Sequence, residues 1–138
     1  MRVFRQAHAP GTAPGTLPER PEPVEPTVVH LVRFGLDEIR EEDVPAAAAP
    51  PPAIASLTTW IDVQGHDVDQ IAMLGSQLDI HSLVLEDVVN VGQRPKVEDY
   101  EDSIFIVLDH FTMDDAYILG KEQISVVIQQ GSVLSARE

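Results

Sequence analysis

The chain has 138 residues, 43% of them hydrophobic, which is enough to bury the core of one domain. It contains no cysteine, which excludes disulfides, thiolate zinc sites and cysteine nucleophiles. Lys and Arg total 9 against 23 Asp and Glu, a net charge of −14 that opposes binding to nucleic acid or anionic lipid and attracts cations. No apolar run approaches the ~18 residues that span a bilayer, and the N-terminus lacks a signal-peptide core, so we expect a soluble chain.

Residues 1–26 are predicted to form a Pro- and Gly-rich tail, because "APGTAPGTLPERPEPVEP" has no period of two or 3.6 residues. The first strand is expected at 27–34, where alternate side chains share one face: Val28, His30, Val32 and Phe34. The next segment, 36–43, is predicted to be a short amphipathic helix with Leu36 and Ile39 pointing inward.

A Pro-rich linker is expected at 45–56, and a strand rich in β-branched residues at 57–63. Asp67 is placed to cap a helix, whose predicted buried stripe is Val68, Ile71, Leu74 and Leu78. A further helix is predicted from Ser82, which can cap it, to just before Gly92, which is placed to end it.

Four more strands are expected after Pro95, which forces extended backbone at the start of "RPKVEDY". The almost unbroken apolar run at 103–111 is typical of a strand covered on both faces. Two further strands, at 122–129 and 132–138, flank a Gln-Gly turn. This order predicts one α+β domain over 27–138, with a mixed, largely antiparallel sheet packed with helices.

Motifs of catalysis do not occur in the sequence. It has no Gly-rich phosphate loop, no G-x-S-x-G elbow and no H-E-x-x-H, and its five histidines are scattered. A zinc site needs several imidazoles or thiolates to converge, and the sequence offers no such cluster. We therefore expect that the chain is not an enzyme.

The acidic residues are better candidates for a binding site. Glu86 and Asp87 interrupt an apolar run, and Mg²⁺ prefers oxygen ligands while keeping most of its waters. Adjacent helical residues point about 100° apart, so these two do not easily chelate one ion alone, although each could meet a neighbouring subunit. On spacing alone, a solvated helix edge is the simpler interpretation. The same helix has too many apolar positions for one buried stripe, so Leu83 and Val84 are assigned to a subunit interface.

Other conspicuous residues have structural interpretations. Arg94 and Lys96 could form an anion site, but local ion pairs with Glu98 and Asp99 are the expected arrangement. Trp60, the only tryptophan, is predicted to lie in the core.

Three segments carry a family resemblance: "TWIDVQG" (59–65), "HSLVLEDVVNVGQRPKVEDYEDSIFIVL" (81–108) and "EQISVVI" (122–128). They resemble the N-terminal cytoplasmic domain of the CorA magnesium and cobalt channels. The resemblance covers most of residues 14–138, is weakest before Thr58, and is most specific at "LEDVVN-x-GQRPKVEDY". It implies the CorA soluble-domain fold, as part of a homopentameric channel at the cytoplasmic face of the cell membrane.

The resemblance also implies a function. In this family, divalent cations bind between neighbouring subunits of the cytosolic funnel and hold the pore closed. It assigns a regulatory Mg²⁺, with Co²⁺ or another divalent cation as alternatives, to Asp87, and puts Glu86 beside a second, more peripheral cation site. The chain would then be a regulatory domain that senses Mg²⁺ and gates transport of Mg²⁺ or Co²⁺.

The departures from the family pattern are large. The sequence has no stalk helix, no transmembrane segment and no Gly-Met-Asn motif, so we expect that this chain neither conducts ions nor inserts into the membrane. Two alternatives stay open: a zinc-transporting relative on the same fold, and a non-sensing acidic assembly domain. The lack of cysteine and of clustered histidine argues against zinc at the regulatory site.

Overall fold

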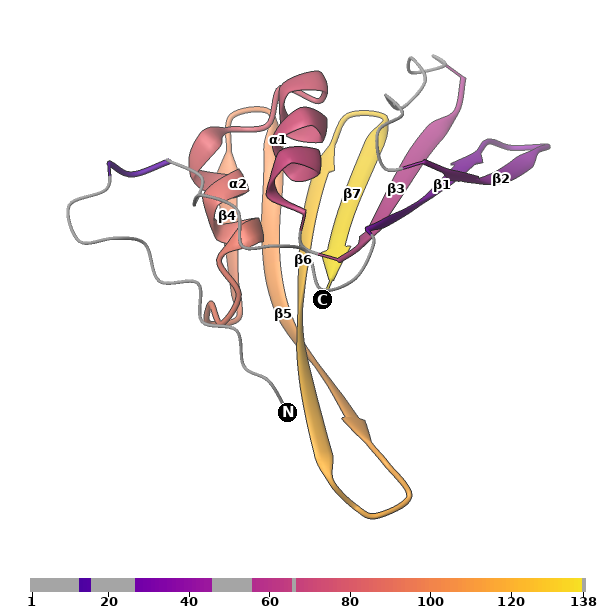
Figure 1. Ribbon diagram of the computed structural model, residues 1–138. Coiled ribbons are helices and arrows are strands. Elements are labelled where there is room, and N and C mark those ends of the chain that lie inside the picture. Colours follow the sequence, from indigo (N-terminus) through magenta and orange to yellow (C-terminus); the bar gives the residue numbers. More distant parts are fainter. Residues whose placement is uncertain (1–12, 16–26, 46–55, 66, 138) are drawn as a thin grey trace.

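The computed structural model describes residues 13–15, 27–45, 56–65 and 67–137. Within them, seven strands form one sheet and two helices cover one of its faces (Figure 1). The elements are β1 (Val28–Phe34), β2 (Ile39–Val44), β3 (Thr58–Gln64), α1 (Val68–Gln77), α2 (Ser82–Val89), β4 (Lys96–Tyr100), β5 (Ser103–Met113), β6 (Leu119–Gln129) and β7 (Ser132–Arg137).

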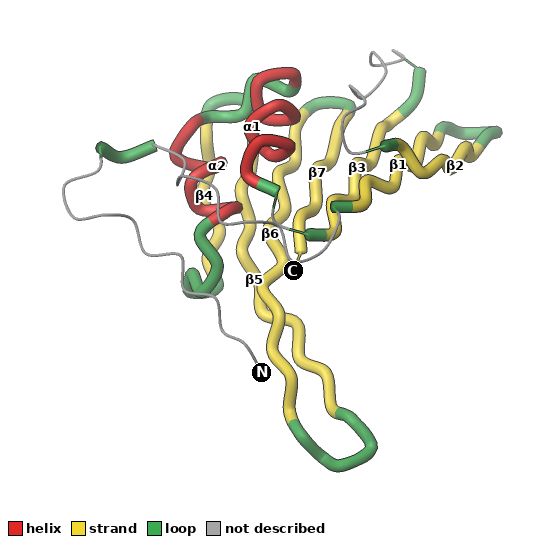
Figure 2. The backbone as a smooth tube through the Cα atoms, viewed as in Figure 1, coloured by secondary structure: helices red, strands yellow, loops and turns green. Residues whose placement is uncertain are grey.

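The strand order is β2-β1-β3-β7-β6-β5-β4. Only the central β3–β7 pair is parallel among these strands, with Ile61 opposite Leu134, and every other neighbouring pair is antiparallel. Both helices lie between β3 and β4 in the chain, so the connection from one half of the sheet to the other carries them (Figure 2). The α+β prediction with a mixed, largely antiparallel sheet is confirmed.

The core lies between the helices and the face of the sheet beneath them. Alternate residues of the central strands point into it, since side chains of a strand alternate between faces. The buried apolar residues of the strands are Val29, Leu31, Ile61, Val63, Phe105, Val107, Val127, Leu134 and Ala136. Those of the helices and their ends are Val68, Ile71, Leu74, Ile80, Val84, Leu85, Val88 and Val89.

The helix ends follow local chemistry. Asp67 caps α1 as predicted, because its Oδ1 accepts hydrogen bonds from the backbone N–H of Asp69 and Gln70 at 3.0 and 3.2 Å. The cap of α2 is His81 rather than Ser82: its Nδ1 accepts from the N–H of Leu83 at 3.2 Å.

The predicted helix over 36–43 is wrong. Residues Ile39–Val44 form β2, which runs back along β1 after a turn closed by the Gly35 N–H and the Glu38 carbonyl at 2.9 Å. So short a helix would need a packed face to be stable, whereas pairing with β1 satisfies the backbone directly. Leu36 and Ile39, expected to point inward, are exposed.

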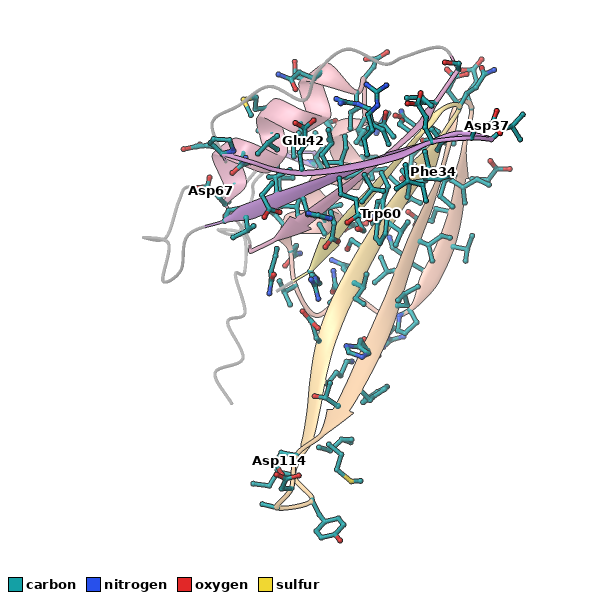
Figure 3. All side chains as sticks on the ribbon, turned by 90° about the vertical axis from the view of Figure 1, so that its right-hand side faces the viewer. Phe34, Asp37, Glu42, Trp60, Asp67 and Asp114 are labelled. Carbon is teal, nitrogen blue, oxygen red and sulfur yellow. The ribbon has the colours of Figure 1, made fainter. Side chains whose placement is uncertain are left out.

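The other face of the sheet is not covered by any described element, which corrects two further predictions. Trp60 is 41% exposed on this face, and its indole N–H donates to Ser135 Oγ at 2.9 Å. Strand β5 is covered on one side only, because Phe105 is buried whereas Ile104 and Leu108 are exposed. Figure 3 views the molecule from the β2 side, and Trp60 and Phe34 are labelled in it.

Strands β5 and β6 extend beyond the rest of the sheet as a two-stranded ribbon (Figure 1), with Asp114 at its far end (Figure 3). The pairing continues to Met113 opposite Leu119. The turn is held by Asp114, whose Oδ1 accepts from the N–H groups of Ala116 and Ile118, each at 2.9 Å. The linker predicted at 45–56 and most of the tail predicted at 1–26 lie outside the described residues.

The two helices are brought together at Gly75. A Cβ atom there would overlap the side chain of Leu85, which is itself buried. We expect Gly75→Ala to lower the free energy of unfolding by about 1–3 kcal/mol, because overpacking exceeds the helix-propensity gain of about 1 kcal/mol. In a Leu85→Ala background the same change should be neutral or stabilising. Denaturant unfolding of wild type, the two single variants and the double variant measures these free energies. If Gly75→Ala alone made the protein more stable than wild type, the prediction would be wrong.

The β1–β2 pairing predicts a pH effect. His30 Nδ1 lies 2.7 Å from Asp43 Oδ1. This hydrogen bond raises the pKa of His30 above 6.5, because it outweighs the slight burial that would lower the pKa. The negative charges of Asp43, Glu41 and Asp62 act in the same direction as the hydrogen bond. Protonated His30 therefore stabilises the fold below about pH 6.5, and the effect is lost as pH rises through the folded-state pKa. Imidazole NMR titration measures this pKa. Asp43→Asn should lower it, and a wild-type pKa at or below 6.5 would contradict the prediction.

Candidate metal centre on helix α2

Helix α2 lies over the β4 side of the sheet, and its two acidic residues lie at its border with the surface. The side chain of Asp87 is 23% exposed, and Glu86 is half-buried. The apolar stripe of the helix fixes this orientation, because Val84, Leu85, Val88 and Val89 all point into the core. The two carboxylates therefore lie on neighbouring sides of the helix, as the ~100° step between adjacent helical residues requires.

The carboxylate of Asp87 is paired with a lysine from β4. Lys96 Nζ donates to Asp87 Oδ2 at 2.6 Å and to Glu98 Oε1 at 2.9 Å. Tyr100, further along β4, donates its hydroxyl to Glu98 Oε2 at 3.2 Å. The ammonium also lies 5.5 Å from the ring centroid of Phe105, within the range of a cation–π contact. The local ion pair predicted between Lys96 and Glu98 is confirmed.

This cluster changes the acidity of two groups. Burial on its own would lower the pKa of Lys96, but the hydrogen bonds to Asp87 and Glu98 and their charges outweigh it, so the pKa is raised above 10.5. Burial, assisted by the charge and hydrogen bond of Glu98, raises the pKa of Tyr100. At neutral pH both groups are therefore protonated, and Lys96 acts as a fixed positive charge between two carboxylates.

Glu86 meets the N-terminal segment. The backbone N–H of Gly15 donates to Glu86 Oε2. Gly15 has φ +79 and lies so close to Ser82 that a Cβ atom would come within 2.7 Å of its Oγ, so only glycine fits there without strain. The described part of the predicted tail, residues 13–15, thus contacts the outer surface of α2.

A buried glutamine fixes the end of α2. The Oε1 atom of Gln123, on β6, accepts from the N–H groups of Gly92 and Gln93 at 2.8 and 2.9 Å. Its Nε2 donates to Ser125 Oγ at 3.1 Å and to the carbonyl of Asp87 at 3.4 Å. Gln123 thereby connects the backbone of the candidate metal residue to the sheet. Sequence reasoning missed this residue, although its place in the inward period of β6 was a signal.

The other residues assigned to the site are placed as follows. Leu83 is 39% exposed on α2, whereas Val84 is fully buried in the core, so only Leu83 offers a surface to a partner subunit. Arg94, part of the alternative anion site, is exposed. In the part of the chain that the structure describes, no three His, Asp or Glu side chains are grouped so as to hold a metal ion.

The residues present fit a partial site for a hydrated divalent cation. Asp87 Oδ1 has no hydrogen-bond partner among the described residues, so one oxygen of this carboxylate is available while the other holds Lys96. Mg²⁺ commonly binds proteins through one or two carboxylates and keeps its remaining waters. Glu98 offers a second carboxylate at the same lysine.

Comparisons with known proteins agree with this fold. The structure of CorA from Methanocaldococcus jannaschii matches with TM-score 0.52 and 16% identity, over 82% of this chain and 32% of that one. The separately determined soluble domain of the same CorA matches with TM-score 0.51 and 16% identity, over 77% of this chain and 39% of that one. Full-length CmaX matches with TM-score 0.57 and 13% identity, over 85% and 36%. The architecture is thus that of the CorA soluble domain.

Sequence comparison identifies the family. A family model described as CorA-like Mg²⁺ transporter protein matches residues 56–138. The cobalt/magnesium transport protein CorA of Thermotoga maritima is 37% identical over 141 aligned positions, covering 100% of this chain and 40% of the relative. The chain belongs to the CorA-like Mg²⁺ transporter family. This membership is consistent with the expectation that it is not an enzyme. Among the described residues, no helix has the length and apolar character needed to span a membrane.

The Gln123 contacts predict a local effect on α2. Gln123→Ala leaves the Gly92 and Gln93 amides without their acceptor, so we expect a stability loss of about 1–3 kcal/mol and faster amide exchange at both. Gln123→Glu keeps the acceptor and should protect both amides better than alanine does. Hydrogen exchange measured by NMR tests this. Gln129→Ala is the matched control, because it removes a hydrogen bond to the Leu78 carbonyl, which lies at the end of α1. If the Gly92 amide exchanged at the same rate in all of these variants, the prediction would be wrong.

Proposed function

We propose that this chain is the cytosolic regulatory domain of a CorA-type Mg²⁺/Co²⁺ transporter and that it binds Mg²⁺ where two subunits meet. Asp87 is the main ligand, and Glu86 lies beside a second, peripheral cation site. The observation that carries the proposal is the family match over 56–138, which includes α2 and the strands that hold it. The partly exposed Asp87 carboxylate, which has one oxygen without a hydrogen-bond partner among the described residues, supports the same assignment.

Charge gives the physical reason for such a site. Each copy carries a net charge of −14, so copies arranged around an axis repel one another. A divalent cation shared between Asp87 and carboxylates of the next subunit offsets this repulsion. The exposed Leu83 lies on the same helix and supplies an apolar contact at the proposed interface.

Gating follows from differential affinity. A cation that binds the closed ring better than the open one shifts the population toward the closed ring, and by no more than that difference in affinity. When cytosolic Mg²⁺ falls, the bridges empty and repulsion between subunits favours the open ring. The domain would thus report Mg²⁺ at the cytoplasmic face of the membrane to the pore.

Two alternatives make different predictions. A zinc-transporting relative would respond to Zn²⁺ in preference to Mg²⁺ at α2. An acidic assembly domain would respond to neither at a defined place, because its charge serves solubility only.

An amide NMR titration with Mg²⁺ distinguishes them. We expect weak but saturable shifts at residues around Glu86 and Asp87, and their loss in Asp87→Ala with the fold intact. Asp99→Ala is the matched control, because Asp99 is an exposed carboxylate on the neighbouring strand β4 and should leave the shifts unchanged. Zn²⁺ is titrated in parallel.

Each other outcome identifies a rival. Saturation at α2 by Zn²⁺ alone would support the zinc-transporting relative. Small, unsaturating shifts spread over all acidic residues, equal in wild type and Asp87→Ala, would mean charge screening and support the assembly domain.

A further inference from the structure

The ammonium of Lys96 is surrounded by groups that attract a cation. Lys96 Nζ lies 2.6 Å from Asp87 Oδ2 on α2 and 2.9 Å from Glu98 Oε1 on β4. The centroid of the Phe105 ring is 5.5 Å from the same nitrogen. The two nitrogen–oxygen distances are those of charge-assisted hydrogen bonds, which are the stronger class. The lysine side chain is 27% exposed, so the cluster is accessible to solvent.

We infer that Lys96 is a built-in competitor of the divalent cation and sets the concentration at which Asp87 binds it. The inference rests on the proposed function, because it concerns the same carboxylate. With Lys96 in place, the two carboxylates and the ammonium sum to one negative charge. Without the ammonium they sum to two, and both carboxylates are available to the ion.

The competition follows from simple electrostatics. A divalent ion at Asp87 must either push the ammonium aside or bind beside a positive charge, and either costs affinity. Because the cluster is partly buried, water screens this repulsion less than it would at an open surface. Removing the lysine charge should therefore strengthen divalent binding by roughly tenfold or more.

The same lysine stabilises the metal-free state. Without a cation, Asp87 and Glu98 would be two like charges meeting at one point between α2 and β4. Lys96 neutralises one of them and connects the helix to the strand when the metal is absent. A divalent ion that displaces the ammonium would take over this role, and one that binds beside it would do so against the repulsion of a fixed positive charge.

Lys96→Met tests the inference, because methionine keeps much of the apolar stem over Phe105 and removes only the charge. The probe is MgCl₂ at constant ionic strength, followed by amide shifts of α2 and by calorimetry on the 138-residue chain. We expect Mg²⁺ affinity to rise roughly tenfold or more over wild type, and the gain to vanish in Lys96→Met/Asp87→Asn. Lys96→Arg, which keeps the charge, should bind like wild type.

Lys121→Met is the matched control. Lys121 pairs with Asp109 at 2.8 Å, away from α2 on the β5–β6 ribbon, so its loss changes the net charge equally without touching the cluster. It should leave Mg²⁺ binding at α2 unchanged. An equal gain in Lys121→Met would show that net charge, not the position of Lys96, governs affinity, and would overturn the inference.

The failure of the inference differs from that of the proposed function. Wild-type binding lost in Asp87→Ala, with no gain in Lys96→Met, overturns the inference alone. Lys96→Met could bind Mg²⁺ in a way that depends on Asp87 while the wild-type chain binds none. That result would support the inference and count against Mg²⁺ sensing by the wild-type domain. No Asp87-dependent binding in either protein overturns both. If Lys96→Met does not fold, Lys96→Gln replaces it. A second measurement uses the wild-type chain: the inference requires the NMR resonance of Lys96 Nζ to shift when Mg²⁺ is added.

Discussion

Burial of a single face of the sheet is the constraint on which the structure depends. Helices α1 and α2 both lie on that face, and they meet so closely that a Cβ atom at Gly75 would overlap the side chain of Leu85. This packing sets the rotation of α2, and the rotation of α2 sets the position of Asp87 at the edge of the core. The geometry of the candidate centre is therefore a consequence of hydrophobic packing.

Features that depend on neighbouring residues could be predicted from the sequence. The Asp67 cap, the apolar stripe of α1, the turn at Gly131 and the strand after Pro95 each follow from a short pattern. Features that depend on distant packing could not. The described elements leave one face of the sheet uncovered, so Trp60 is exposed. Strand β1 offers an edge for pairing, so the segment expected to be a helix pairs with it as β2.

The candidate site divides in the same way. Glu86 and Asp87 stand out in the sequence because charges interrupt an apolar helix, and the pairing of Lys96 with Glu98 follows from their spacing on one strand. The pairing of Lys96 with Asp87 requires α2 to be placed over β4, and the role of Gln123 requires β6 to run beneath the end of α2. No pattern within either segment contains that information.

The outer strands of the sheet have a consequence for how copies of this chain can associate. Strand β2 has the sequence IREEDV, and β4 has the sequence KVEDY, so both outer strands of the described sheet carry several charges. Charged edges oppose the addition of further strands, which is the usual route to uncontrolled β-aggregation. Association through the edges of this sheet is therefore disfavoured, and any contact between copies would use helix surfaces or sheet faces instead.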